Sequence, residues 1–505
     1  MLLVREAKVL GLGRAGVAVL IALVFWAGCQ RQRADQPRVD DRAAQPKAAF
    51  SQSAQEVPAA AKASVATVAA AGESPAGRAN FVAAAHASEF DASRFEVPRI
   101  DEDAVKAAGL RKVGGEHITI YTDLPAAAEI EELPRVFDAA VLQWCDYFSV
   151  PKEKASDWKV VASVMKDKGR FVTTGLYPAS LPDFANGYNV GSQIWVFDQP
   201  SGYYRRHLLL HEGTHAFMLR FLGGAGPPWY MEGMAELLAT HRWQNDQLEL
   251  AVMPQRKEDV PYWGRIKIIK DDVAADRGLS LMEVMKYDAK AHLKVEAYGW
   301  CWAAAWFLSH HPQTATAFAD LETAARDRSL EFSKRFYENL KPDWPAIAED
   351  WQIFTGECDY GYDVARAAVV RKPVAELPME GATVNVSADH GWQSTGFRLS
   401  AGKKYEVKAS GRYTVRASPP KLICEPGGIT LHYHRGRPLG ILLAGVSEID
   451  QTTSQKTPLL SPQSIGLSGD LIPAATGTLF LKINEASSGL ADNSGSLNVE
   501  IREIN

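Results

Sequence analysis

The feature that most constrains the fold of this 505-residue chain is the string LLLHEGTHAFML at 208–219. Its apolar residues recur at helical spacing and closely spaced glycines follow, so we predict a helix that ends near residue 223. On a helix, His211 and His215 lie on one face, one turn apart, with Glu212 between them. Two imidazole nitrogens at this spacing can bind one Zn²⁺ and hold Glu212 next to a water molecule. The alternative is a buried helix that carries two paired histidines.

A catalytic zinc site needs a third protein ligand and an open position for water. A second helix is predicted for the string WYMEGMAELLA, directly after two prolines. Glu232 lies in its first turn, and a tight helix–turn–helix hairpin would bring it back to the histidine pair. Glu236 follows on the same face, where it can accept a hydrogen bond from the far nitrogen of a ligand imidazole. The alternative for both acids is the solvated face of an amphipathic helix.

The strings HEGTH and PPWYMEGMAELLA together resemble the gluzincin zinc peptidases, in particular the peptidase-MA-like group. The resemblance covers roughly residues 115–360 and is specific only at 207–240. It implies an α+β fold, Zn²⁺ as cofactor, and hydrolysis of a peptide or protein substrate. It implies the following roles: His211, His215 and Glu232 as zinc ligands, Glu212 as general base, and Glu236 as the acid that supports a ligand histidine.

Two further residues are candidates for roles around the metal. The oxyanion that develops during amide hydrolysis needs an additional donor, and such peptidases often use a Tyr or His from a later helix. Tyr298, in the string AYGWCWAAAWFLSHH, is our candidate, and the alternative is an aromatic residue packed in a tryptophan-rich core. His207, one turn before His211, is expected to support or pack against the site rather than to bind the metal.

Residues 1–29 have the pattern of an export signal, with basic residues before an uncharged apolar run at 15–28. The run is short for a membrane span. It ends in WAGC, which resembles a bacterial lipobox in which Cys29 becomes the lipidated first residue. An uncleaved signal anchor and ordinary signal cleavage are the alternatives, and all three export the protein. We therefore expect a membrane-anchored lipoprotein of the bacterial cell envelope that faces the periplasm or the outside.

Residues 30–88 are rich in Ala, Gln, Pro, Ser and charged residues, and they predict a disordered tether. We place the metallopeptidase domain at 89–372 and a second domain at 373–505. The net charge is −5 and no basic patch is evident, so we expect no nucleic-acid partner. The four cysteines after Cys29 lack zinc-site spacing, and in an exported protein they allow three disulfide pairings.

Hydrophobic periodicity predicts strands before the zinc helix and helices after it. In such α+β peptidases a sheet edge often serves as the wall along which an extended peptide pairs. The strands are expected at 117–124, 158–167 and 192–199, and the helices at 126–150, 280–287, 298–310, 314–326, 330–339 and 344–355. After about residue 372, short strands with Gly, Ser, Asn and Pro turns predict an all-β sandwich.

The string INEASSGLADNSGSLNVEI near the C-terminus resembles the calcium-dependent galactose-binding lectins of the PA-IL type. The resemblance implies that the sandwich binds Ca²⁺ and glycans, with sugar contacts near His432 and His434. The implied calcium ligands are oxygens, which Ca²⁺ prefers: Glu485, Asp492, Asn493 and the Gly489 carbonyl. Glu485 departs from the family, which has Asp there, and the alternative is a structural sandwich with a metal-free loop.

Two hypotheses of different classes follow. The first is an exported, lipid-anchored zinc metallopeptidase with Glu212 as general base and an accessory β-sandwich. The second is a surface carbohydrate-binding or adhesion protein whose peptidase-like domain is inactive. The complete set of expected zinc ligands favours the first.

Overall fold

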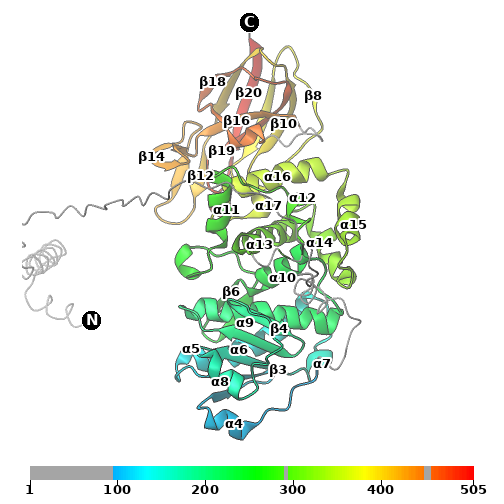
Figure 1. Cartoon of the computed structure of the whole chain (residues 1–505). Helices are drawn as coiled ribbons and strands as arrows, with labels where there is room; N and C mark the ends of the chain where they lie inside the picture. Colours follow the sequence, from blue (N-terminus) through cyan, green and yellow to red (C-terminus); the bar gives the residue numbers. More distant parts are fainter. Residues whose placement is uncertain (1–94, 289, 291–293, 449–455, 505) are drawn as a thin grey trace, which may run out of the picture. The chain divides into compact units, whose positions relative to one another are not determined.

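The computed structural model describes residues 95–288, 290, 294–448 and 456–504, all within one compact unit that spans 75–505. The predicted export signal at 1–29, with Cys29, lies outside the described residues. So do the whole predicted tether at 30–88 and the first six residues, 89–94, of the domain placed at 89–372. Within the described ranges, no helix is both long enough and apolar enough to cross a membrane. The fold mixes helices with several sheets, as predicted for an α+β protein (Figure 1).

A five-stranded sheet opens the described part, in the order β1-β2-β3-β5-β4. Strands β2, β3 and β5 are parallel, whereas β1 and β4 run antiparallel at the two edges. The central strand β3 is buried along its whole length, as expected for a strand covered on both faces. The bounds are β1 (Arg111–Gly114), β2 (Ile118–Thr122), β3 (Val160–Met165), β4 (Gly187–Val190) and β5 (Gln193–Phe197).

One face of this sheet contributes to the main hydrophobic core, together with helices α6 and α9. The other face carries a smaller core that includes Tyr121, Val161 and Trp195. Helix α9 (Gly202–Phe217) is capped by the Ser201 hydroxyl, which accepts from the Tyr204 amide. The sheet is flanked by α4 (Glu102–Ala107), α5 (Ala128–Glu131), α6 (Leu133–Tyr147), α7 (Lys152–Ala155) and α8 (Lys168–Thr173).

The chain turns back tightly after α9. A π-helical segment, η2 (Met218–Leu222), ends at Gly223, whose φ of 73° favours glycine. Helix α10 (Pro228–Ala239) then begins with a proline in its first turn. Gly224 lies so close to a neighbouring loop that an added Cβ would be 2.4 Å from the Ala325 carbonyl oxygen. The glycine run therefore both ends the helix and lets the hairpin close.

The region after α10 is mainly helical, and α13 is buried on nearly all sides between α10 and α11. Gly233 permits this packing, because a Cβ there would be 2.9 Å from the Cys301 carbonyl oxygen. The helices are α11 (Arg265–Ala274), α12 (Leu281–Val284), α13 (Val295–His310), α14 (Ala315–Ala319), α15 (Leu330–Leu340), α16 (Trp344–Glu357) and α17 (Val364–Ala367). A short hairpin, β6 (His241–Gln244) and β7 (Gln247–Leu250), precedes them.

Several predicted helices differ from the observed ones. The helix expected at 126–150 is divided into α5 and α6, because Pro134 lies in the first turn of α6 and starts a new helix. The helix expected at 280–287 is only four residues long, and that at 314–326 continues as a 3₁₀ segment, η5 (Asp320–Ala324). Helix α11 was not predicted.

A β-sandwich follows from about residue 375. Its two sheets have the orders β17-β16-β19-β10-β8 and β18-β11-β20-β9, with a shared apolar core. The strands are β8 (Ala375–Glu376), β9 (Ala382–Ser387), β10 (Gln393–Leu399), β11 (Lys404–Ser410), β16 (Leu442–Ser447), β17 (Gln463–Ser464), β18 (Ser468–Leu471), β19 (Gly477–Ile483) and β20 (Ser496–Ile504). Two small hairpins complete it: β12 (Tyr413–Arg416) with β13 (Leu422–Cys424), and β14 (Ile429–His434) with β15 (Arg437–Leu439).

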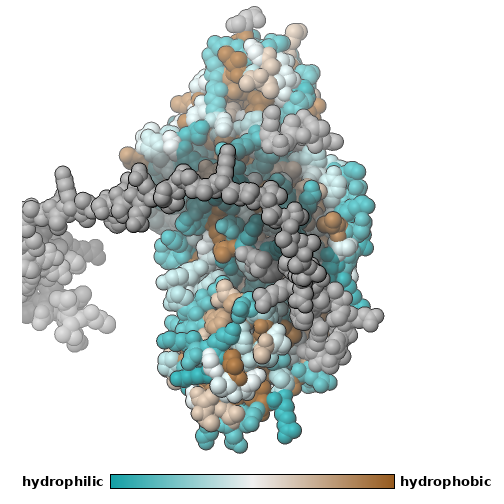
Figure 2. Space-filling view, viewed as in Figure 1, coloured by the Kyte–Doolittle hydropathy of each residue, from teal (hydrophilic) through white to brown (hydrophobic). Residues whose placement is uncertain are grey.

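The sandwich is joined to α16 by a buried polar cluster. The Glu349 carboxylate accepts from the Ser447 and Thr457 hydroxyls at 2.7 and 2.8 Å, and from the Arg371 guanidinium at 2.8 Å. The face in Figure 2 carries its hydrophobic residues in small separate groups among hydrophilic ones. The four cysteines of the described ranges are all buried and unpaired, so none of the three possible disulfide pairings is formed.

Candidate metal centre

The hairpin of α9 and α10 brings together the three side chains expected to bind zinc. Nε2 of His211 lies 3.1 Å from Nε2 of His215 and 3.2 Å from Oε2 of Glu232. Nε2 of His215 lies 3.6 Å from the same carboxylate oxygen. All three side chains are largely buried. The apolar faces of both helices pack into the main core, and this packing turns the polar residues toward each other.

These distances fit a tetrahedral zinc site. Zn–N and Zn–O bonds of about 2.1 Å at tetrahedral angles separate neighbouring ligand atoms by roughly 3.4 Å. The three observed separations bracket that value. Oε2 of Glu232 is buried and has no hydrogen-bond partner among the described residues, as expected for an atom that faces a cation.

The charge of the site also suits a divalent cation. Glu212, Glu232 and Glu236 are all buried around the histidine pair. Among the described residues, Arg265 is the one permanently charged side chain that forms an ion pair with any of these acids, and its partner is Glu236. Burial alone would lower the pKa of His211, but the Glu232 and Glu236 carboxylates raise it well above its usual value. Burial alone would likewise raise the pKa of Glu232, but its two histidine partners lower it. The surplus of carboxylates therefore stabilises positive charge at this point.

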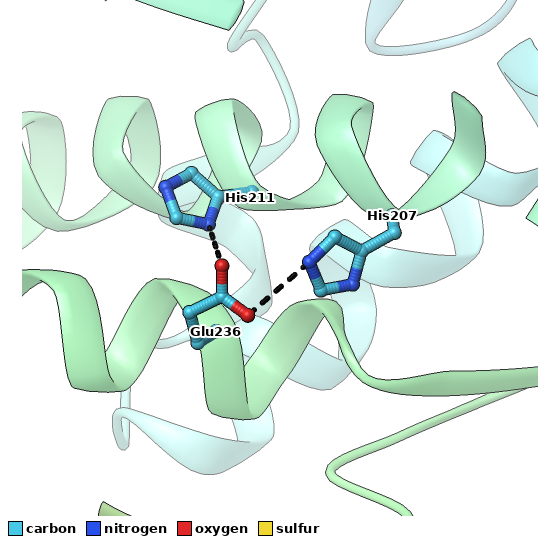
Figure 3. Close-up of side chains that lie close together, drawn as sticks. All are labelled: His207, His211 and Glu236. Atoms are coloured by element: carbon cyan, nitrogen blue, oxygen red, sulfur yellow. Dashed lines mark ion pairs between the residues drawn. The ribbon is translucent and has the colours of Figure 1, made fainter. Parts of the chain in front are cut away.

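The Glu236 carboxylate lies between His211 and a further buried histidine, His207 (Figure 3). Its Oε1 lies 3.4 Å from Nδ1 of His211, and its Oε2 lies 3.3 Å from Nε2 of His207. Glu236 thus lies near the nitrogen of His211 that points away from His215 and Glu232, but at 3.4 Å His211 Nδ1 forms no hydrogen bond among the described residues. The role of Glu236 in supporting a ligand histidine stays a prediction. A carboxylate in this position fixes the imidazole so that Nε2 keeps its lone pair for a metal.

Arg265, at the start of α11, completes this arrangement and was not predicted. Its Nε and Nη2 donate to the two oxygens of Glu236 at 2.9 and 2.7 Å, and Nη1 donates to the Trp263 carbonyl. The Arg265 guanidinium also lies 5.8 Å from the centre of the Tyr298 ring. Two hydrogen bonds from one guanidinium to both oxygens of a buried carboxylate form a strong, directional interaction. The sequence carried no motif for Arg265, because its relation to Glu236 depends on how α11 packs against α13.

His207, His211 and Glu236 could also be considered as a metal-binding group, since their ligand atoms lie within 4.8 Å of one another. Arg265 argues against this second group, because it already donates to both Glu236 oxygens. A dication placed beside a buried guanidinium would be repelled. Nδ1 of His207 is also bound to the Ala239 carbonyl oxygen at 3.0 Å. Of the two groups, His211, His215 and Glu232 is therefore the better candidate for binding a metal.

Glu212 lies on α9 between the two histidines, and its side chain is also buried. Burial raises its pKa, whereas the neighbouring histidines oppose that rise. Tyr298, in the first turn of α13, has its ring centroid 5.9 Å from that of His211. Burial, followed by the charges of Glu232 and Glu212, raises the pKa of the Tyr298 phenol, so it stays protonated as a donor. The structure thus places both residues beside the expected ligands.

The loop of the sandwich that resembles a calcium site is folded as the 3₁₀ segment η7 (Ser487–Asp492), and α17 packs against it. Asn493 Nδ2 donates to Oε2 of Glu485 at 2.7 Å. Burial raises the pKa of Glu485 to about 7, and Asp492 adds to that rise. Oδ2 of Asp492 accepts from the Ala417 amide at 3.0 Å.

Asn493 Oδ1 is buried without a hydrogen-bond partner among the described residues, so an oxygen suitable for Ca²⁺ is present there. The carbonyl-bearing residue Gly489 lies against Glu485, since a Cβ on it would be 2.3 Å from Oε1 of that acid. His432 is exposed on β14, and His434 at the end of this strand is partly buried. The expected oxygen donors are therefore adjacent, and calcium binding stays a prediction.

No protein-family model matches this chain, and no curated protein matches it. Among solved structures, the EclA N-terminal domain, a PllA-like lectin, matches 24% of this chain and 95% of its own length, with 22% identity and a TM-score of 0.18. The IMPa metallopeptidase in complex with T-antigen matches 78% of this chain and 47% of its own length, with 11% identity and a TM-score of 0.15.

IMPa from Pseudomonas aeruginosa in complex with an O-glycopeptide matches 79% of this chain and 43% of its own length, with 11% identity and a TM-score of 0.14. The chain thus spans less than half of these metallopeptidase chains. Similar structures therefore include metallopeptidases and a lectin domain, but TM-scores this low do not establish a shared fold.

Proposed function

We propose that this protein is a zinc-dependent metallopeptidase of the gluzincin type. The observation that carries the proposal is the convergence of His211 Nε2, His215 Nε2 and Glu232 Oε2 within 3.6 Å of one another, at separations that suit tetrahedral Zn²⁺. Three protein ligands leave a fourth position open, which distinguishes a catalytic site from a structural one.

A bound Zn²⁺ would polarise the scissile carbonyl and lower the pKa of water. The side chains of the chain perform the remaining steps. Glu212 accepts a proton from the attacking water at its carboxylate and transfers it to the leaving nitrogen. The Tyr298 hydroxyl donates a hydrogen bond to the oxyanion that develops on the substrate. Glu236, held by Arg265, keeps the His211 imidazole oriented throughout.

The substrate is proposed to be a peptide or protein that lies in extended form along β4. This strand is the outermost of its sheet, and α9 packs against it. Among the described residues no further strand pairs with the outer edge of β4. A peptide paired there would present its carbonyls beside Glu212. Export to the cell envelope and lipidation at Cys29 belong to the same proposal and are tested by metabolic labelling with a palmitate analogue, which a Cys29→Ala variant would not incorporate.

The sandwich is proposed to bring the enzyme to glycan-bearing substrates, with Ca²⁺ held by Glu485, Asp492 and Asn493. The specific observation in favour is the buried Oδ1 of Asn493, which has no hydrogen-bond partner among the described residues. A glycan array with and without calcium tests this, and binding in neither condition removes it. The competing hypothesis, an adhesion protein with an inactive peptidase-like domain, requires glycan binding together with a site that takes up no zinc.

The decisive experiment uses the whole chain. Zinc content is measured by mass spectrometry of the purified protein after dialysis, and cleavage is measured on a proteome-derived peptide library. We expect one zinc per chain and a reproducible set of new peptide termini. Glu212→Gln should keep the zinc and lose the cleavage, whereas His215→Ala should lose both. Wild-type protein that takes up no zinc would disprove the proposal.

A further inference from the structure

Gly187, the first residue of the edge strand β4, lies directly against Glu212. A Cβ added to Gly187 would be 2.5 Å from Oε1 of Glu212, 3.1 Å from its Cγ and 3.2 Å from its Cδ. All three distances are shorter than ordinary van der Waals contact, which starts at 3.4 Å. The backbone of Gly187 does not have positive φ, so an alanine could adopt it without backbone strain. A side chain at position 187 is therefore disfavoured by its volume and not by the backbone conformation.

The pairing of β4 explains why this position faces the helix. Gly187 is the register partner of Val196 on β5, and Val196 belongs to the core that also contains the apolar face of α9. The next residue, Tyr188, pairs with Trp195, which belongs to the core on the opposite face of the sheet. Side chains alternate along a strand, so Gly187 is on the α9 side, where a side chain would meet Glu212.

We propose that Gly187 is a positioning residue for the reaction, because its bare backbone sets where the Glu212 carboxylate rests. This inference rests on the proposed function of the site. A methyl group at position 187 would push Oε1 away by roughly 1 Å, and a shift of that size in a catalytic group costs on the order of 100-fold in rate. Oε1 is the end of a flexible side chain, so Glu212 yields rather than the strand, and folding is preserved.

The same strand adjoins both the proposed base and the proposed substrate. The β4 backbone that limits Glu212 on one side is the strand along which the peptide is proposed to lie. The distance between the base and a strand-paired substrate is therefore set by one piece of backbone. A side chain at 187 would change that distance without touching His211 or His215.

The test compares Gly187→Ala with the wild type in the full chain. The matched control is Gly114→Ala on β1 of the same sheet, where an added Cβ meets nothing within 4 Å. Zinc content, the thermal unfolding midpoint, and kcat and KM on a synthetic peptide taken from the library are measured for each. We expect Gly187→Ala to lower kcat about 100-fold with KM, zinc content and midpoint unchanged, and Gly114→Ala to change none of them.

A double-mutant cycle with Glu212→Asp separates positioning from a general structural role. The shorter acid withdraws its carboxylate by roughly 1.5 Å, so adding Gly187→Ala to it should cost only a few-fold more. An undiminished 100-fold loss in that background would overturn the inference. Crystal structures of zinc-loaded wild type and Gly187→Ala supply a readout without activity, and an unmoved carboxylate would overturn it too. A wild type that cleaves nothing refutes the proposed function, while the crystal structures still decide whether Gly187 positions Glu212.

Discussion

Arg265 offers the sharpest test of how the site is held together. Its side chain is 6% exposed and that of Glu236 1%, and the two are joined by hydrogen bonds of 2.9 and 2.7 Å. Arg265→Met keeps much of the volume but leaves the Glu236 carboxylate buried without its guanidinium. Removing one partner of a buried ion pair costs about 3–5 kcal/mol of unfolding free energy. We expect a loss of that size.

The effect on the metal should follow through His211. With Arg265 gone, Glu236 is no longer held in place opposite Nδ1 of His211, so the imidazole is less well oriented. Loss of such a support weakens metal binding by about 10–100-fold. Urea unfolding of the chelator-treated protein measures stability without the contribution of bound metal, and competition with a chromophoric chelator measures zinc affinity.

A second variant and a control make the result decisive. Adding Glu236→Gln to Arg265→Met removes the uncompensated charge, so much of the lost stability should return while zinc affinity stays low. Arg242→Met breaks an exposed ion pair with Glu249 and should cost only about 0–1 kcal/mol. The reasoning would be refuted if Arg265→Met lowered the unfolding free energy no more than Arg242→Met does. It would also be refuted if Arg265→Met lowered that free energy as much in the Glu236→Gln background as in the wild type.

Two other predictions concern stability. Burial, followed by the charge of Arg206, lowers the pKa of His241 to about 3, so between pH 6.5 and 3 only the unfolded chain binds this proton. The contribution of His241 to stability is therefore fully present above pH 6.5 and falls below it by about 1.4 kcal/mol per pH unit, roughly 2 kcal/mol by pH 5. Urea unfolding at pH 6.5 and pH 5 should therefore show a smaller loss of stability in His241→Gln than in the wild type, by about this amount. Ser447→Ala removes a donor to the buried Glu349 carboxylate and should cost about 1–3 kcal/mol. An unchanged urea midpoint would mean that the sandwich does not contact α16 in solution.

The two helices of the site could be predicted from sequence because their signals are local. Helical spacing alone places His211 and His215 on one face of α9, and the glycines and prolines between residues 223 and 228 mark the break. The hairpin was predicted with Glu232 as its third ligand, and the structure brings Glu232 to within 3.6 Å of both histidines. Periodicity also located three of the five strands before α9, namely β2, β3 and β5, with ends that differ by one or two residues, whereas β1 and β4 were not predicted.

Elements with short or broken patterns were less predictable. Helix α11 has ten residues and begins with a buried arginine, and two of its four buried residues, Arg265 and Asp272, are charged. The helix expected at 314–326 changes to a 3₁₀ segment, which hydrophobic spacing does not distinguish from an α-helix. Tyr298 was predicted as part of the site, and its ring does lie beside that of His211. Its role as a donor to the oxyanion stays a prediction.

The sequence by itself determined which residues could bind zinc, because ligand spacing on a helix is a property of neighbours along the chain. Only the tertiary structure showed which residues fix the positions of the acidic side chains beside them. Arg265 reaches Glu236 through the packing of α11, and Gly187 reaches Glu212 through the register of β4 with β5. Both contacts join segments distant in sequence, and neither leaves a periodic pattern. A lone arginine and a lone glycine become informative only once folding has placed them against the two acids of the site.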